Sequence, residues 1–150
     1  MSPTRSIYNY MARYFLDTHI VVWLITDDHK LDESLKNEIK YPSAKDKYVT
    51  SEFVILELMH LKQLKKIDYK GTAKNLIESL ASFGINLEPI STKVFETLEK
   101  LPILTIEKKA HTDMIDRIII AQSIECNCTC ISHDHKFPYY RKYDLKLLEA

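Results

Sequence analysis

The sequence has 150 residues, of which 45% are hydrophobic and 28% charged, as in one ordinary globular domain. Lysine plus arginine equals aspartate plus glutamate at 21 each, so any nucleic-acid surface must be a local patch. Two glycines, Gly71 and Gly84, exclude a glycine-rich phosphate loop. No apolar run approaches the roughly eighteen residues of a membrane span. With no signal peptide recognisable either, we expect a cytoplasmic protein.

Residues 1–12 are polar and mixed, and we expect them to form an extension outside a single domain of residues 13–150. Within that domain, short apolar runs alternate with amphipathic ones. Strands are predicted at 14–17, 48–50, 85–90, 129–132 and 144–148, and helices at 18–26, 31–39, 51–66, 72–83, 92–100 and 113–125. The alternation predicts a three-layer α/β/α fold with a central, mostly parallel sheet. Because Val and Ile are frequent in 18–26, a strand is the alternative there.

Three cysteines stand close together, at Cys126, Cys128 and Cys130. Zinc sites usually take four nitrogen or sulfur ligands from paired Cys-x-x-Cys units, so this spacing argues against zinc. We expect buried free thiols, as in a reducing compartment.

Four aspartates are predicted to meet at one edge of the sheet. Asp17 ends the first strand, Asp134 follows the strand at 129–132, and Asp113 and Asp116 open a helix. In open α/β sheets, ligands bind at the carboxyl ends of the strands, where helix N-termini also lie. The plain alternative for Asp113 and Asp116 is a helix cap and a first-turn charge.

Glu57 adds a fifth carboxylate near the same edge. Its predicted helix places it on an apolar face, shared with Phe53, Val54, Leu61 and Leu64. Burying an unpaired carboxylate costs several kcal/mol, and crowded carboxylates raise one another's pKa. A cation among these acids removes both problems, although Glu57 could instead reach water at the edge of its stripe.

Oxygen ligands suit a hard cation such as Mg²⁺ or Mn²⁺. Ions held by several carboxylates typically serve phosphoryl chemistry. From the residues alone, we therefore predict a metal-dependent phosphodiesterase or phosphatase.

An ordered set of short motifs spans residues 14–148. These motifs are Phe15-Leu16-Asp17-Thr18-His19 with Trp23-Leu24, Ser51 with Glu57, Asp113-Met114-Ile115-Asp116-Arg117 with Ala121-Gln122, and Ser132-His133-Asp134 with Phe137. In this order they resemble a PIN domain of the VapC type. The resemblance implies an endoribonuclease that depends on Mg²⁺ or Mn²⁺, commonly the toxin of a type II toxin–antitoxin pair neutralised by a small antitoxin protein. We also expect a homodimer and no membrane association.

The resemblance further implies roles for individual residues. The catalytic, metal-binding acids are Asp17, Glu57, Asp116 and Asp134, with Asp113 as an additional metal ligand. Thr18 and Ser132 match hydroxyl positions that line the site, and Arg117 either contacts substrate phosphate or pairs with a neighbouring acid. Met114 stands where the subgroup usually has proline. Proline at a first helical turn mainly preorganises the backbone, so we expect little effect on the chemistry.

Residues 135–143 interleave basic and aromatic side chains directly after Asp134. This mixture is typical of single-stranded nucleic-acid binding, so Lys136 and Arg141 are predicted substrate contacts. The alternative is a solvated turn whose aromatic rings pack on the sheet edge. His60, His133 and His135 also suggest metal ligation, but a di-iron site would need a second Glu-x-x-His unit.

Two other functions stay open at this point. One is a catalytically silent PIN-like module that binds a protein partner through helix 51–66 or the face of 31–41. The other is a metal-dependent phosphatase, but the haloacid dehalogenase class requires an Asp-x-Asp pair, whereas Asp17 precedes Thr18 and His19.

Overall fold

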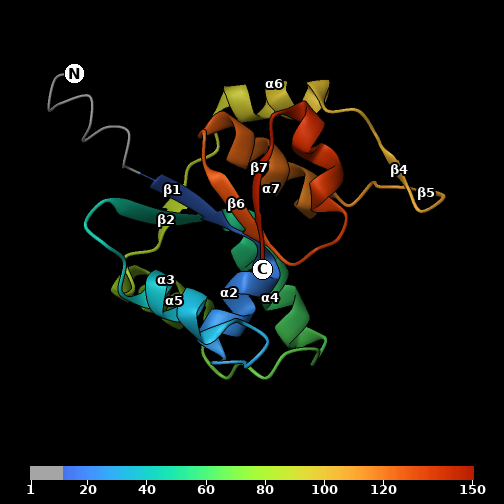
Figure 1. Cartoon of the computed structure of the whole chain (residues 1–150). Coiled ribbons are helices and arrows are strands. Elements are labelled where there is room, and N and C mark those ends of the chain that lie inside the picture. The colour runs from blue at the N-terminus through green and yellow to red at the C-terminus, as the bar shows by residue number, and fades with distance from the viewer. Residues whose placement is uncertain (1–11) are drawn as a thin grey trace, which may run out of the picture.

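A five-stranded parallel sheet forms the centre of the protein (Figure 1), in a computed structural model that describes residues 12–150. Its strands are β1 (Ala12–Leu16), β2 (Asp46–Ser51), β3 (Asn86–Glu88), β6 (Thr129–Ser132) and β7 (Lys146–Glu149). The strand order is β3-β2-β1-β6-β7, and every neighbouring pair is parallel. The predicted central parallel sheet is confirmed.

Helices cover both faces of this sheet, which confirms the predicted α/β class. They are α2 (Thr18–Ile25), α3 (Glu33–Lys40), α4 (Glu52–Gln63), α5 (Ala73–Ser82), α6 (Thr92–Lys100) and α7 (Met114–Glu125). In Figure 1, α6 and α7 lie on one side of the sheet, whereas α2, α3 and α5 lie on the other. Helix α4 contacts both α2 and α7. None of the helices formed by residues 12–150 is long and apolar enough to cross a lipid bilayer.

Helix α2 forms in the segment where Val and Ile also favoured a strand. Asp17 caps it by accepting a hydrogen bond from the Thr18 amide, 2.8 Å away. The helix is buried on nearly every side, which explains why its sequence shows no clear helical stripe. Gly84, which was predicted to end the helix at 72–83, lies just after α5 and has φ of 77°. Glycine adopts this left-handed conformation freely.

The predicted N-terminal extension, residues 1–12, is described by the structure only at its last residue. Ala12 belongs to β1 and lies opposite Asp46 of β2, and residues 1–11 lie outside the described part of the chain. Two other elements were not predicted. A hairpin of β4 (Thr105–Ile106) and β5 (Lys109–Ala110) precedes α7, and a 3₁₀ helix, η1 (Phe137–Tyr143), occupies most of the predicted basic turn.

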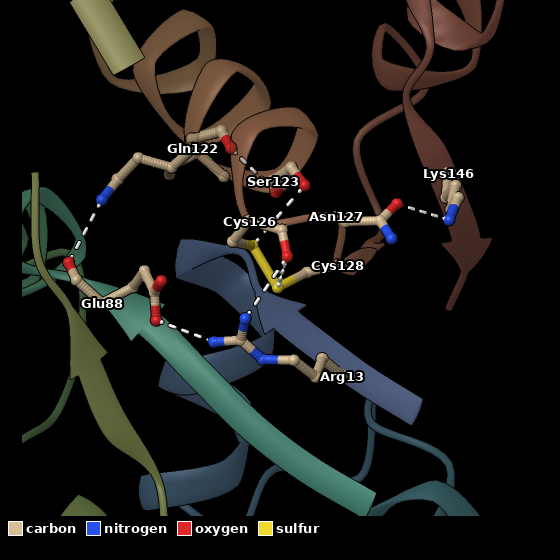
Figure 2. The surroundings of a disulfide bond; sticks show 9 residues. Arg13, Glu88, Gln122, Ser123, Cys126, Asn127, Cys128 and Lys146 are labelled. Carbon is tan, nitrogen blue, oxygen red and sulfur yellow. Dashed lines mark hydrogen bonds and ion pairs between the residues drawn. A yellow bond between two sulfur atoms is a disulfide. The ribbon is translucent and has the colours of Figure 1, made fainter. Parts of the chain in front are cut away.

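Cys126 and Cys128 are joined by a disulfide at the turn from α7 into β6 (Figure 2), so the expectation of free thiols is wrong for these two. Asn127 between them has φ of 56°. Arg13 of β1 donates to the Cys126 carbonyl at 3.4 Å and pairs with Glu88 of β3 at 3.1 Å. Cys130 is a buried free thiol, as predicted. The turn is thereby attached to the neighbouring strands.

Candidate functional site

The order of the strands creates a switch point between β1 and β6. The chain adds β2 and β3 on one side of β1, and then β6 and β7 on the other side. A crevice opens at the carboxyl ends of the strands at such a point. Asp17 directly follows β1 and Ser132 ends β6, and the Asp17 amide donates to the Ile131 carbonyl at 3.1 Å. Two predicted site residues therefore lie side by side at this crevice.

Asp17 is buried at the carboxyl end of β1, where two hydrogen bonds hold its side chain. Only 3% of the residue is exposed. One carboxylate oxygen accepts from the Thr18 amide, and the other accepts from the Ser132 hydroxyl at 2.7 Å. Burial raises the pKa of Asp17, and the charge of Asp134 adds to the rise, whereas the two hydrogen bonds lower it.

Ser132 connects Asp17 to Asp134. The oxygen of its hydroxyl accepts a hydrogen bond from the Asp134 amide at 3.1 Å while its proton goes to Asp17. The Asp134 carboxylate accepts from the Lys136 amide at 2.9 Å, and the Lys136 ammonium lies 3.5 Å from its second oxygen. One hydroxyl thus positions two carboxylates, and a lysine partly neutralises one of them.

Asp113 and Asp116 open α7, as predicted. Asp113 caps the helix by accepting from the Asp116 amide at 2.9 Å. Burial raises the pKa of Asp116 to about 8, with further contributions from the charges of Asp113, Asp17 and Asp134, whereas Lys136 acts in the opposite direction. The Asp116 carboxyl is thus within range of the charges of the other three aspartates.

His111 and Tyr140 were not predicted as part of this group. The imidazole Nε2 of His111 lies 3.0 Å from an Asp116 carboxylate oxygen, and its Nδ1 lies 2.6 Å from the Tyr140 hydroxyl. Burial lowers the pKa of His111, and the charge of Lys136 adds to this, which favours a neutral ring. With Asp116 ionised, a neutral ring donates from Nε2, so Nδ1 accepts the tyrosine proton. His111 and Tyr140 are 29 residues apart in the sequence, so no local pattern predicts their contact. The only signal in the sequence was that His111 stands beside the acid motif.

Glu57 lies half-buried on α4, facing the same group. Burial raises the pKa of its carboxyl, and the charges of Asp113 and Asp17 contribute. The Thr18 hydroxyl partly offsets this rise, yet its oxygen is buried and makes no hydrogen bond of regular geometry within residues 12–150. Each of the five predicted acids thus interacts electrostatically with at least two of the others. Thr18 adds a polar oxygen that lacks a regular partner.

The donor chemistry of this group fits a hard divalent cation. Its donors are oxygen atoms, which such cations prefer, and Lys136 is the only ammonium that pairs with any of the five acids in the described chain. In the described residues, no three His, Cys, Asp or Glu side chains lie close enough to form a metal-binding group as they stand. Side-chain rotation is therefore required before several acids share one ion.

Two predicted substrate contacts, both arginines, donate hydrogen bonds to backbone carbonyls. The Arg117 guanidinium is buried and donates to the carbonyls of Leu101 and Pro102, at 2.9 and 3.0 Å. Arg141 of η1 donates to the Leu147 carbonyl and pairs with Glu149, both at 3.3 Å. Two nitrogens of Arg117 thus bind the segment after α6, and one nitrogen of Arg141 binds β7. The predicted contact of either arginine with substrate phosphate stays a prediction.

The family model of the PIN domain matches residues 14–143. The chain belongs to the PIN domain family. No curated protein matches this PIN domain. Among solved structures, it is similar to a chain in the crystal structure of VapBC2 from Rickettsia felis bound to a DNA fragment from their promoter, with 21% identity and a TM-score of 0.68 over 91% of this chain and 98% of that one. A chain of VapBC-1 from nontypeable Haemophilus influenzae matches with 17% identity and a TM-score of 0.64, over 91% and 97%.

Two open hollows flank the acids of this PIN domain. One lies beside the β4–β5 hairpin and is lined by His111, Asp113 and Lys136, among others. An ion pair of 3.4 Å between His135 and Glu107 connects the loop after Asp134 to the hairpin turn. The second hollow lies on the α2 side and is lined by His19, Trp23 and His133, together with Asp134 and Lys136. One hollow thus reaches Asp113 and the other reaches Asp134.

Proposed function

We propose that this PIN domain is a metal-dependent endoribonuclease of the VapC type and the toxin of a type II toxin–antitoxin pair. The observation that carries the proposal is the group of aspartates at the switch point, where burial and three neighbouring carboxylates raise the pKa of Asp116 to about 8. Carboxylates crowded in this way stay ionised together at neutral pH only when a cation lies beside them. Membership of the PIN family and the likeness to VapBC structures support the assignment.

We assign Mg²⁺ or Mn²⁺ to this group, held by Asp17, Glu57, Asp116 and Asp134, with Asp113 as an additional ligand. When bound, such an ion activates water and stabilises the leaving oxygen of a phosphodiester. Ser132 holds Asp17 and Asp134 together, and His111 orients Asp116. The chain thus supplies oriented oxygen donors, and Thr18 and Ser132 line the site.

Lys136 is the residue that we propose as the contact for substrate phosphate. Its ammonium lies 3.5 Å from Asp134, its side chain is 37% exposed, and it lines both hollows that flank the acids. An RNA phosphate can therefore reach it while the scissile bond lies at the acids. Antitoxin binding and a homodimer remain part of the proposal; the likeness to VapBC chains supports a partner protein.

One observation favours the alternative of a protein-interaction module. An apolar hollow between α4, α6 and α7 is lined by exposed side chains, with 59% of Leu56, 54% of Phe95 and 82% of Met114 accessible. Apolar surface of this kind is typical of interaction sites. An interaction module does not require catalysis, so an activity measurement separates the two functions.

The test is cleavage of single-stranded and folded RNA with Mg²⁺ or Mn²⁺, against EDTA, by proteins purified identically. We expect Asp17→Asn and Asp116→Asn each to lose about a hundredfold or more in rate. Asp144→Asn is the matched control, because Asp144 is exposed and has φ of 73°, a conformation that asparagine tolerates. Equal cleavage by all proteins, or cleavage in EDTA, contradicts the proposal. No cleavage of any RNA, together with a tight protein complex, favours the interaction module.

A further inference from the structure

A line of three open hollows leads from the acids along α2 to the end of α4. The first contains Asp134, Lys136 and the rings of His19 and Trp23. The second shares His19, Trp23 and Lys30 with the first and extends to Lys66. The third shares Lys66 and continues over the loop after α4. Consecutive hollows share lining residues, so they adjoin one another, and together we call them the groove.

Six lysines line this groove, which we call the lysine track. They are Lys30, Lys62, Lys65, Lys66, Lys70 and Lys136. Three carboxylates also line it, namely Asp28, Asp68 and Asp134, and the Asp28 carboxylate accepts a hydrogen bond from the Lys30 amide at 2.9 Å. On a chain with no net charge, the lysine track is thus a local positive surface.

Most of these ammonium groups are available to a ligand. Lys62 donates to the Gly71 carbonyl, and Lys136 pairs with Asp134. Lys30, Lys65, Lys66 and Lys70 are exposed, and no ion pair between residues 12 and 150 involves them. Four lysines without a carboxylate partner in one groove indicate an anionic ligand with several charges.

Aromatic rings lie where the track meets the acids. The Trp23 ring packs against His133 with centroids 5.1 Å apart, and against His19 at 6.0 Å. Both histidines are exposed, whereas only 7% of Trp23 is. Rings beside a row of lysines are the combination that binds single-stranded nucleic acid, in which bases stack and phosphates meet cations.

We propose that the lysine track binds the single-stranded part of an RNA substrate next to the scissile phosphate. The lysines contact successive phosphates, and one base packs on the exposed rings of His19 and His133, which lie against Trp23. This inference rests on the proposed nuclease function and deepens it. The lysines at the end of α4 take no part in the acid group. In this proposal their role is to bind RNA phosphates.

Trp23 allows a direct test because it is the only tryptophan in the chain. The full chain is titrated in EDTA with an oligouridylate of about ten nucleotides, and tryptophan emission and the anisotropy of a labelled copy are followed in separate titrations. We expect the emission to change and to saturate together with the anisotropy. Lys30→Gln and Lys66→Gln should each weaken binding roughly three- to tenfold. Lys93→Gln on α6 lies outside the track and should have no effect.

Each outcome of this test has a defined meaning. Unchanged affinity in both Lys30→Gln and Lys66→Gln, or no RNA binding by the unmutated chain, overturns the track. An identical emission change with inorganic polyphosphate overturns the stacked base. Metal-dependent cleavage is measured on the same preparations. Cleavage without lysine-dependent RNA binding contradicts the lysine track and leaves the proposed nuclease function intact. Lysine-dependent RNA binding without cleavage contradicts the nuclease function and leaves the lysine track intact.

Discussion

The Asp116 carboxylate illustrates at the scale of one residue how a proposed metal ligand can oppose folding. Its pKa is raised to about 8 from the ordinary value of 3.8. Below pH 3.8 the carboxyl is protonated in both folded and unfolded chains. Between the two values the unfolded chain releases the proton and the folded chain keeps it, so stability falls as pH rises, and the full penalty is present above pH 8.

We therefore predict that Asp116→Asn stabilises the metal-free protein. Asparagine keeps the shape of the side chain and removes the charge, and its carbonyl can still accept from His111. At pH 8 in EDTA we expect a gain of about 2 kcal/mol, which is roughly 5 °C in Tm, and a smaller difference at pH 5. Thermal melts across this pH range check it.

Thermal melts of the same proteins with added Mn²⁺ provide the control. Mn²⁺ should raise the Tm of the unmutated protein more than that of Asp116→Asn, because a ligand stabilises the state that binds it. Asp144→Asn should melt like the unmutated protein under every condition. A metal-free Asp116→Asn protein that melts at or below the unmutated one means that the carboxylates are less crowded than their pKa values indicate.

Contacts between secondary-structure elements fix the position of this carboxylate. Tyr140 of η1 contacts His111, which follows β5, and His111 contacts Asp116 in the first turn of α7. The His111 amide also donates to the Leu104 carbonyl at 2.8 Å, at the base of the hairpin. Three elements thus meet behind Asp116, and the tyrosine hydroxyl connects η1 to the other two.

We predict that Tyr140→Phe lowers both stability and activity. The ring keeps its packing, but the buried Nδ1 of His111 loses its partner, which costs about 1–3 kcal/mol in the free energy of unfolding. His111 can then donate from Nδ1 instead of Nε2, so Asp116 loses its orienting hydrogen bond. We expect a roughly tenfold loss in cleavage rate and in Mn²⁺ affinity.

The control for this change is Tyr143→Phe, because Tyr143 packs near Tyr140, with centroids 6.5 Å apart. This variant should affect neither Mn²⁺ affinity nor cleavage. Denaturant unfolding, calorimetric Mn²⁺ titration and cleavage rates are the measurements. Reduced stability with unchanged Mn²⁺ affinity in Tyr140→Phe shows that the contact supports only the fold.

The sequence predicts the elements that have their own periodic or buried apolar pattern. The five strands of the sheet and the six helices were predicted within a few residues, because capping residues such as Asp17 and Asp113 mark where helices begin. The β4–β5 hairpin was missed because Glu107 and Lys108 form its turn with φ of 51° and 68°. Asn-Gly or Asp-Gly is the usual signal for such a turn.

The positions of several acids could also be predicted from the sequence, because these acids stand next to predicted elements. Asp17, Asp113 and Asp134 stand at the ends of predicted elements, and parallel topology brings those ends together. The contact of His111 with Tyr140 and the carbonyls bound by Arg117 depend on loops that show no periodic pattern. The disulfide was missed because Cys-x-Cys spacing allows a bond only when the turn at Asn127 brings both thiols together.

At the scale of the whole molecule, charge is distributed unevenly on a chain whose net charge is zero. Acids gather at the switch point, and lysines line the groove that leads away from it. A neutral protein does not attract RNA over long distances. Affinity for RNA therefore depends on contacts along the lysine track, and these contacts should give a strong salt dependence that the whole-chain charge alone does not predict.

We predict that the affinity for single-stranded RNA falls roughly 50-fold between about 50 and 200 mM salt. This estimate assumes that about four lysines each neutralise one phosphate, with a slope of about 0.7 per phosphate in a plot of log affinity against log salt. Lys30→Gln and Lys66→Gln should each reduce the slope by about 0.7, and Lys93→Gln should leave it unchanged. Anisotropy titrations in EDTA at several salt concentrations measure the slope. A slope near zero, or one that Lys93→Gln reduces as much as Lys30→Gln, means that RNA is held by diffuse charge or by base contacts instead of by the track.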